Sequence, residues 1–297
     1  MPTNACPLTR AMTSDGNARV LIINAKNMVN DAIGFHHLSP TAAAALGRTL
    51  AAASMIGVML KNAGDSVTVT FSGDGVCGKI LATADYLGNV KGYVQNPKAD
   101  LPLNNRGKLD VAGAVGKGFL TVVRDEGEKE PYVGSVPIVS GEIAEDITEY
   151  FARSEQIPTV CALGVLVGKD YTCLAAGGFM IQLLPGADED FISRLEARLP
   201  LIPPVSTLFS SGQTNDEYLK TILGDIPYDI FDEGDAFYRC DCSRERVERA
   251  LISIGEKDLT EMIDDGKDIE VACQFCDKKY TFTPAELAAL KASAART

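Results

Sequence analysis

The alternation of hydrophobic and polar residues predicts a large domain of strands and helices up to about residue 185. Segments in which every second residue is apolar recur between glycine-containing turns, as expected for strands. These predicted strands cover 65–71, 79–84, 90–94, 118–124, 132–139, 159–167 and 171–184, with two more short strands inside 6–25. Periodicity near 3.6 residues instead predicts helices over about 26–35, 40–62 and 142–154. We therefore expect an α+β fold, with a mixed sheet-and-helix domain over 1–185.

The segment 42–60 is long and apolar enough to raise the question of a membrane span. Much of it is alanine, however, which is only weakly hydrophobic, and Arg48 lies inside it. A central arginine costs about 2.5–3.5 kcal/mol on insertion scales. We therefore predict no membrane partner, and a long helix that begins at the Ser39-Pro40-Thr41 cap and packs within the domain.

The pattern changes after residue 185. Residues 187–199 and 214–223 have helical periodicity, and an acidic run from Asp225 to Asp235 follows them. These amphipathic helices have no evident core of their own, so they must pack on the domain before them. We predict a helical linker region over 186–236.

The remaining residues, 237–297, contain four cysteines in two close pairs, Cys240-x-Cys242 and Cys273-x-x-Cys276, separated by thirty residues. A segment of that length can fold back and place four sulfurs around one ion. Four thiolates suit a closed tetrahedral zinc site, because zinc is borderline-soft and imposes no geometry of its own. A domain of about 60 residues rarely stabilises itself by burial alone. We therefore predict a small zinc domain whose fold depends on the ion.

The spacing leaves four interpretations open: a structural zinc knuckle, a redox-switched zinc site, a pair of structural disulfides and a dithiol oxidoreductase. The tight Cys240-x-Cys242 pair places two thiols within reach of each other, which favours a redox role beside a structural one. A dithiol enzyme would need its CxxC at the start of a helix, whereas residues 269–271 and 280–282 alternate like the strands of a hairpin. The first residues lack the apolar core of a signal peptide, so we expect a reducing cytoplasm and free thiols.

Composition and isolated motifs mainly exclude functions. The chain is 46% hydrophobic and 23% charged, and its net charge of -12 argues against a nucleic-acid partner. The glycine-rich segment 73–78 matches GxGxxG but leads into strand-like sequence, which predicts a hairpin turn. The two histidines, His36 and His37, are adjacent and lack a neighbouring carboxylate pattern, so we expect a helix-end or surface role.

No nucleophile, base and oxyanion site come together, and we expect no enzymatic activity. The isolated cysteines expected to pack in the core are Cys6, Cys77, Cys161 and Cys173.

Three segments near the paired cysteines carry a distinctive signature: CDCSRER at 240–246, CQFC at 273–276 and YTF at 280–282. Further segments upstream occur in a matching order, at 71–75, 116–119, 149–159 and 175–179. Together they resemble the heat-shock protein 33 family, the redox-regulated holdase chaperones of the bacterial cytosol, over nearly the whole chain. One departure is Asp277, where a knuckle often has glycine; it could alter a turn but should not remove a ligand.

The resemblance implies a mechanism that composition does not reveal. In this family the reduced protein is inactive and holds one zinc ion through four cysteines, which implies Cys240, Cys242, Cys273 and Cys276 here. Hypochlorous acid, or peroxide with unfolding stress, oxidises the thiolates and releases the zinc. Each close pair then forms a disulfide, which implies Cys240–Cys242 and Cys273–Cys276.

The resemblance also implies what the oxidised form does. The helical linker loosens, apolar surface is exposed, and the protein binds unfolding or oxidatively damaged client proteins without ATP; the active form tends to be a homodimer. We therefore expect an ATP-independent holdase. The alternative is a zinc-knuckle protein in which a purely structural zinc supports binding to a defined partner.

Overall fold

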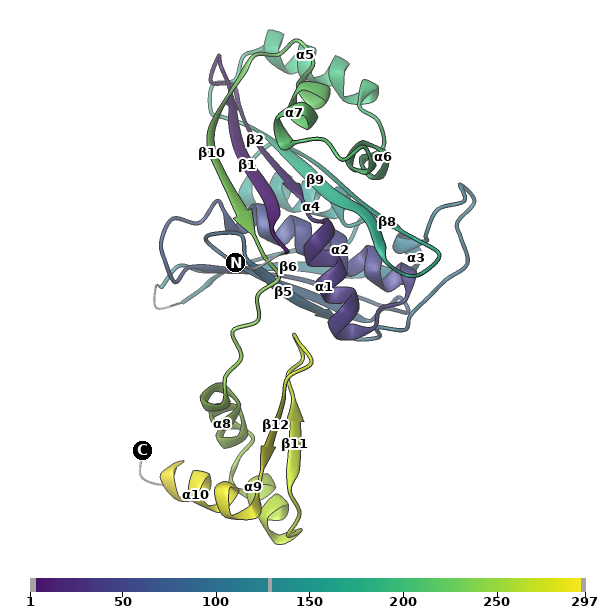
Figure 1. The fold of residues 1–297 in the computed structure, drawn as a ribbon. Coiled ribbons are helices and arrows are strands. Elements are labelled where there is room, and N and C mark those ends of the chain that lie inside the picture. The colour runs from purple at the N-terminus through teal and green to yellow at the C-terminus, as the bar shows by residue number, and fades with distance from the viewer. Residues whose placement is uncertain (1–3, 128–129, 295–297) are drawn as a thin grey trace. The chain divides into compact units, whose positions relative to one another are not determined.

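The computed structural model describes residues 4–127 and 130–294. Its contacts divide the chain into two compact units, the first ending at Arg239 and the second beginning at Cys240 (Figure 1). The first unit contains two antiparallel sheets and most of the helices, and the second contains a short hairpin, three helices and the paired cysteines. This arrangement confirms the predicted α+β class.

Two five-stranded antiparallel sheets form the framework of the first unit. The first sheet has the order β10-β1-β2-β9-β8 and the second has the order β5-β4-β3-β6-β7. The strands of the first sheet are β1 (Cys6–Thr13), β2 (Ala18–Asn24), β8 (Thr159–Val167), β9 (Cys173–Leu183) and β10 (Tyr228–Ala236). Those of the second are β3 (Ser66–Gly73), β4 (Lys79–Asp85), β5 (Val90–Val94), β6 (Gly118–Asp125) and β7 (Tyr132–Pro137).

The alanine-rich helix α2 (Pro40–Gly57) packs between the two sheets and is almost entirely buried (Figure 1). Ser39 caps its first turn by accepting a hydrogen bond from the amide of Ala42, as the sequence predicts. Small side chains let it approach both sheets closely; a Cβ at Gly57 would lie 2.4 Å from the carbonyl oxygen of Asp85. Its single charge, on Arg48, pairs with Glu142 at 2.6 Å. Among the residues described, none of the helices combines the length and apolar character needed to cross a bilayer.

The other helices of the first unit before residue 185 surround this core. They are α1 (Lys26–His36), α3 (Val111–Val115) and α4 (Ala144–Tyr150), which continues as the π-helical turn η1 (Phe151–Glu155). His36 ends α1, as predicted, and burial lowers the pKa of its ring. The glycine-rich segment after β3 turns directly into β4, which confirms the hairpin interpretation.

Three short helices cover the face of the first sheet that α2 does not (Figure 1). They are α5 (Glu189–Arg198), followed by the 3-10 turn η2 (Leu199–Leu201), α6 (Val205–Ser210) and α7 (Asn215–Leu223). Their apolar side chains form a second core with the sheet. From the helices come Phe191, Leu208, Phe209, Tyr218 and Ile222, and from the sheet Val20, Ile22, Phe179 and Ile181. The prediction that these helices borrow a neighbouring surface is therefore confirmed, and β9 is buried on both faces as a result.

The end of the predicted helical region is a strand, and here the prediction was wrong. Residues 228–236 form β10, which pairs antiparallel with β1 from Thr13↔Tyr228 to Cys6↔Ala236. The acidic side chains suit this position, because β10 is a mostly exposed edge strand and charges discourage further pairing there. Arg10 of β1 and Asp232 form an ion pair across the two strands at 2.7 Å.

Immediately after β10, residues 237–239 are held against the second sheet. The amide of Val90 donates to the carbonyl of Phe237, and the amide of Arg239 donates to the carbonyl of Val90, both at 2.8 Å. The Tyr238 hydroxyl donates to the carbonyl of Gly92 at 2.8 Å, and its ring lies 5.3 Å from that of Phe35. The first unit therefore anchors the chain up to the residue before Cys240.

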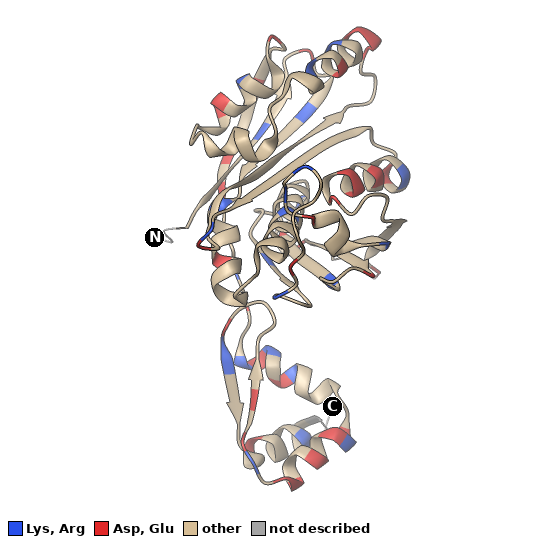
Figure 2. Cartoon of the chain, turned by 90° about the vertical axis from the view of Figure 1, so that its right-hand side faces the viewer, with Lys and Arg blue, Asp and Glu red and all other residues tan. Residues whose placement is uncertain are grey.

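The second unit has a small core and a charged surface. Its elements are α8 (Arg244–Ser253), α9 (Glu256–Asp264), β11 (Ile269–Ala272), β12 (Lys279–Phe282) and α10 (Pro284–Ala294). The buried residues of its hydrophobic cluster are Leu251, Leu259, Phe282 and Leu287. Basic and acidic residues are interspersed over its helices (Figure 2), and several form exposed ion pairs, which contribute little stability. So small a core supports the expectation that the unit needs another source of stability.

The contact between α6 and β9 gives a direct test of how the short helices are held. A Cβ at Gly177 would lie 2.5 Å from Cδ1 of Phe209 and 2.6 Å from the carbonyl oxygen of Ile23. We expect Gly177→Ala to displace α6 at a cost of about 1–3 kcal/mol, with faster amide exchange over 205–223. Gly34→Ala is the matched control, because nothing lies within 4 Å of its Cβ position. Unchanged exchange in Gly177→Ala would contradict this packing.

Candidate metal centre

The structure brings the four paired cysteines of the second unit together. Cys240 and Cys242 precede α8, and Cys273 and Cys276 lie in the turn between β11 and β12. All four sulfurs lie within 4.8 Å of one another. Sγ of Cys240 lies 3.6 Å from Sγ of Cys273, and Sγ of Cys242 lies 3.5 Å from Sγ of Cys276.

These distances fit a site for one metal ion. Zinc–sulfur bonds of about 2.3 Å in a tetrahedron place the sulfurs about 3.8 Å apart. A disulfide would instead bring two sulfurs to about 2.05 Å, and all four cysteines are free thiols here. The cluster can therefore hold a metal ion, and four sulfur ligands leave no position open for a substrate, which is typical of a structural rather than a catalytic zinc site.

The hairpin that carries Cys273 and Cys276 forms as the flanking alternation predicts. Strands β11 and β12 pair from Ile269↔Phe282 to Ala272↔Lys279. The amide of Cys273 donates to the carbonyl of Lys278 at 2.9 Å and closes the turn. Asp277 is accommodated in that turn, so its departure from the usual glycine does not open the hairpin.

Two residues of the CDCSRER segment position the other pair. Ser243 caps α8 by accepting a hydrogen bond from the amide of Arg246, which places Cys242 next to the positive end of the helix. Arg244 lies over the ring of Phe282 at 4.2 Å and donates to the carbonyl of Thr281 at 3.0 Å. It therefore ties the start of α8 to the strand that follows the second cysteine pair.

One sulfur has a further protein donor that the sequence analysis did not identify. The hydroxyl of Tyr280 donates to Sγ of Cys242 at 3.2 Å. The tyrosine lies in the YTF segment on β12, 38 residues from Cys242. The segment was recognisable, but the contact was not, because it depends on how the hairpin folds back.

Burial and hydrogen bonding give the thiols different acidities. Burial raises the pKa of Cys276 to about 11 and also raises the pKa of Cys240. Burial acts the same way on Cys242, but hydrogen bonds from Tyr280 and the neighbouring thiols outweigh it and lower its pKa. A metal ion among the sulfurs would favour the thiolate form of all its ligands.

The remaining cysteines belong to the first unit and lie in or against its main hydrophobic core, as predicted. Burial raises the pKa of each thiol, to about 11 for Cys77 and to about 12 for Cys6, Cys161 and Cys173. Thiols that remain protonated react slowly with oxidants, because the thiolate is the reactive form. These four are therefore packing residues.

Comparison with known proteins matches what the fold and the cluster indicate. The sequence model of the Hsp33 protein family matches residues 7–283. The chain belongs to the Hsp33 family. It is 48% identical over 285 residues to the 33 kDa chaperonin of Clostridium acetobutylicum, covering 95% of this chain and 96% of the relative. It is 50% identical over 285 residues to the 33 kDa chaperonin of Clostridium perfringens, covering 95% and 90%.

The crystal structure of the 33 kDa chaperonin of Thermotoga maritima, a heat shock protein 33 homologue, matches with a TM-score of 0.90. That similarity covers 99% of this chain and 100% of the other, at 35% identity. The chain is therefore a chaperone of the Hsp33 family, which is non-enzymatic, with a four-cysteine metal site in its second unit.

The Tyr280 hydroxyl should matter for metal affinity. Residues that hydrogen-bond a ligand orient it and tune its basicity, and losing one typically costs about 10–100-fold in affinity. We expect Tyr280→Phe to weaken zinc binding by about tenfold in competition with a chromogenic chelator. Tyr228→Phe, which removes a hydroxyl bonded to Asp216 in the first unit, is the matched control. Equal affinities for the two variants would show that the hydrogen bond does not support the site.

Proposed function

We propose that this chaperone is a redox-regulated, ATP-independent holdase, inactive while its four cysteines bind one zinc ion. The observation that carries the proposal is the cluster of Cys240, Cys242, Cys273 and Cys276, within 4.8 Å of one another in a unit with a small hydrophobic core. Structural zinc contributes an apparent 10–16 kcal/mol or so to folding in small domains. Release of the ion therefore unfolds the second unit.

Oxidation supplies the trigger. Each cysteine pair gives two electrons to an oxidant such as hypochlorous acid or peroxide, forms one sulfur–sulfur bond and releases its share of the zinc coordination. In the first step a thiolate attacks the oxidant and becomes a sulfenic acid, as hydroxide or chloride leaves. The neighbouring thiol then attacks that sulfur, and water leaves as the disulfide forms. We propose the pairs Cys240–Cys242 and Cys273–Cys276, because the resolving thiol stays close by even as the unit unfolds.

The cluster itself allows another pairing, because Cys240 and Cys273 approach to 3.6 Å and Cys242 and Cys276 to 3.5 Å. Disulfide mapping of the oxidised protein by mass spectrometry decides between them. Sequence-local pairs support unfolding before the second bond forms. Crossed pairs would mean that the unit stays folded during oxidation, contrary to the proposal.

Loss of the second unit frees the region 186–236. Cys240 directly follows residues 237–239, so unfolding of the second unit removes the ordered structure on one side of the segment that ties the region 186–236 to the second sheet. Helices α5–α7 rest on the first sheet through a single apolar layer that includes Phe179 and Phe209. When they undock, both sides of this layer become exposed, and large exposed apolar surfaces bind other protein chains.

The partners of the active form are unfolding or oxidatively damaged proteins, and we propose that it works as a homodimer in the cytoplasm. Neither ATP nor nucleic acid takes part. The net charge of -12 keeps the exposed state soluble and is unfavourable for nucleic acid.

An aggregation assay tests the proposal. A thermally unfolding client is followed by light scattering without ATP, with reduced zinc-loaded protein or with protein treated with oxidant at an unfolding temperature. Released zinc is measured in the same samples. We expect only the oxidised protein to suppress scattering, in proportion to zinc release. Protection by neither form, or zinc that stays bound throughout, would favour a purely structural zinc knuckle.

Replacing one ligand should mimic the oxidised state. We expect Cys273→Ser to bind zinc much more weakly, to lose protease resistance over 240–294 and to protect clients without oxidant. Cys77→Ser is the control, because Cys77 is a buried core thiol of the first unit. Zinc affinity and protease resistance equal to those of the unmodified protein would contradict the role given to Cys273.

A further inference from the structure

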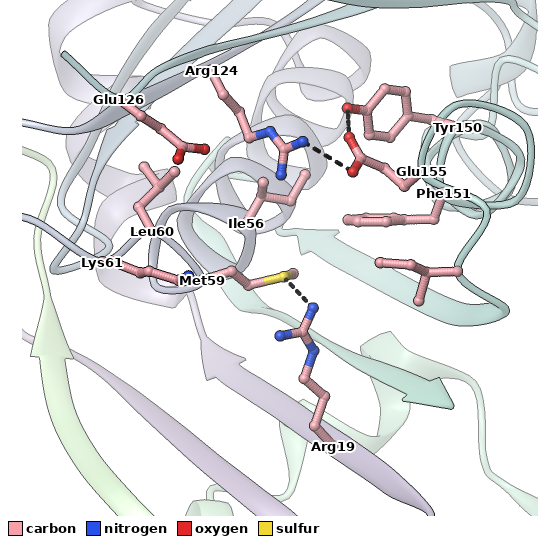
Figure 3. Close-up of a pocket in the computed structure, with 11 residues that line it drawn as sticks. Arg19, Ile56, Met59, Leu60, Lys61, Arg124, Glu126, Tyr150, Phe151 and Glu155 are labelled. Atoms are coloured by element: carbon pink, nitrogen blue, oxygen red, sulfur yellow. Dashed lines mark hydrogen bonds and ion pairs between the residues drawn. The ribbon is translucent and has the colours of Figure 1, made fainter. Parts of the chain in front are cut away.

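A cavity of about 270 Å³ in the first unit is lined by three basic residues from different segments. Arg19 comes from β2, Arg124 from β6, and Lys61 from the connection after α2 (Figure 3). Apolar walls are contributed by Ile56, Leu60, Phe151 and Ile157. A cationic cavity is unexpected in a chain with a net charge of -12, so the way these charges are balanced is informative.

Arg19 has no counter-ion among the residues that the structure describes. Its Nε donates to Oε1 of Gln182 at 2.7 Å, and its Nη2 contacts Sδ of Met59 at 3.3 Å. Gln182 is itself buried, and its amide nitrogen donates to Thr159 at 3.0 Å, which holds its oxygen toward Arg19. The guanidinium is thus fixed by neutral groups, with its charge unbalanced and several N–H donors unused. Partly buried charges without a partner are costly unless an anion compensates them.

Arg124 has a carboxylate partner for its Nη2 but, among the described residues, no hydrogen-bond acceptor for its Nε. Its Nη2 pairs with Glu155 at 3.0 Å, and Glu155 also accepts a hydrogen bond from the hydroxyl of Tyr150. Its Nε is buried and, among the described residues, has no hydrogen-bond partner. Such groups are uncommon in folded proteins and call for an explanation. Figure 3 shows Arg19 and Arg124 extending into the pocket from opposite sides.

The rim of the cavity adds one charge of each sign. Lys61 and Glu126 are both exposed there, and no residue in the described part of the chain forms an ion pair with Lys61. With Glu155 already engaged by Arg124 and Tyr150, the lining has an excess of positive charge. Guanidinium groups bind carboxylate and phosphate groups through paired hydrogen bonds, so the lining matches an oxyanion.

We propose that this cavity binds a small organic oxyanion, with its carboxylate or phosphate group between Arg19 and Arg124. Lys61 closes over the charged group at the rim, and the apolar part of the ligand lies against Phe151 and Ile157. The volume restricts the ligand to a small molecule. The site lies wholly in the first unit and does not depend on the proposed cysteine switch. Binding stabilises the first unit by mass action.

Isothermal titration of the reduced, zinc-loaded full chain with phenyl phosphate tests the proposal, at constant ionic strength. Inorganic phosphate and phenol are titrated in parallel to separate the charged group from the ring. We expect phenyl phosphate to bind, inorganic phosphate to compete with it more weakly, and phenol not to compete. Absence of anion binding at millimolar concentrations, or equal binding of phenol and phenyl phosphate, would overturn the proposal.

Variants locate the binding. Arg19→Gln should weaken phenyl phosphate binding by about tenfold or more, because it removes a charged donor, and Lys61→Gln should weaken it less. Arg194→Gln on α5 is the matched control, since Arg194 is exposed and does not line the cavity. Lys61 is also exposed, so we expect Lys61→Gln to keep the fold. If Arg19→Gln does not fold, the affinity of Lys61→Gln for phenyl phosphate tests the proposal. Affinity unchanged by the replacement of both Arg19 and Lys61 would overturn the proposal.

Discussion

Attraction between four closely spaced sulfurs and one cation is the interaction on which the rest of the proposed mechanism depends. The second unit buries few apolar residues, with Leu251, Leu259, Phe282 and Leu287 at its centre. Its two cysteine-bearing segments are held together by the cluster, by the Tyr280 hydrogen bond to Cys242 and by Arg244. A unit whose stability comes mainly from one metal site can unfold when a single reaction removes the metal. A unit stabilised by a large hydrophobic core would stay folded after the same reaction.

The first unit, in contrast, is stabilised by a large hydrophobic core. Helix α2 is buried between two sheets, and the core thiols are protected by burial that raises their pKa. The helices α5–α7 on its outer face are held less extensively, because these short helices contact the first sheet through one apolar layer. In the proposed switch, oxidation acts on the unit with the smaller hydrophobic core, the release spreads to this layer, and the two-sheet core remains folded and binds clients.

Features set by local sequence could be predicted, and features set by distant contacts could not. The spacing of the cysteines and the alternation around Cys273 and Cys276 predicted the hairpin and the cluster. Strand β10 was missed because its acidic residues have low strand propensity and its partner lies far away; Arg10 and Asp232 are 222 residues apart. The Tyr280 contact and the cavity around Arg19 and Arg124 likewise depend on tertiary structure, and no local pattern marks them.

Hydrogen exchange measured by mass spectrometry on the reduced, zinc-loaded and the oxidised protein tests the central claim most directly. The account predicts that oxidation removes the protection of residues 189–223 and 244–294, while β2 and β9 stay protected. Oxidised, active protein in which 189–223 exchange as slowly as in the reduced state would contradict the coupling between the cysteine cluster and the helices on the first sheet.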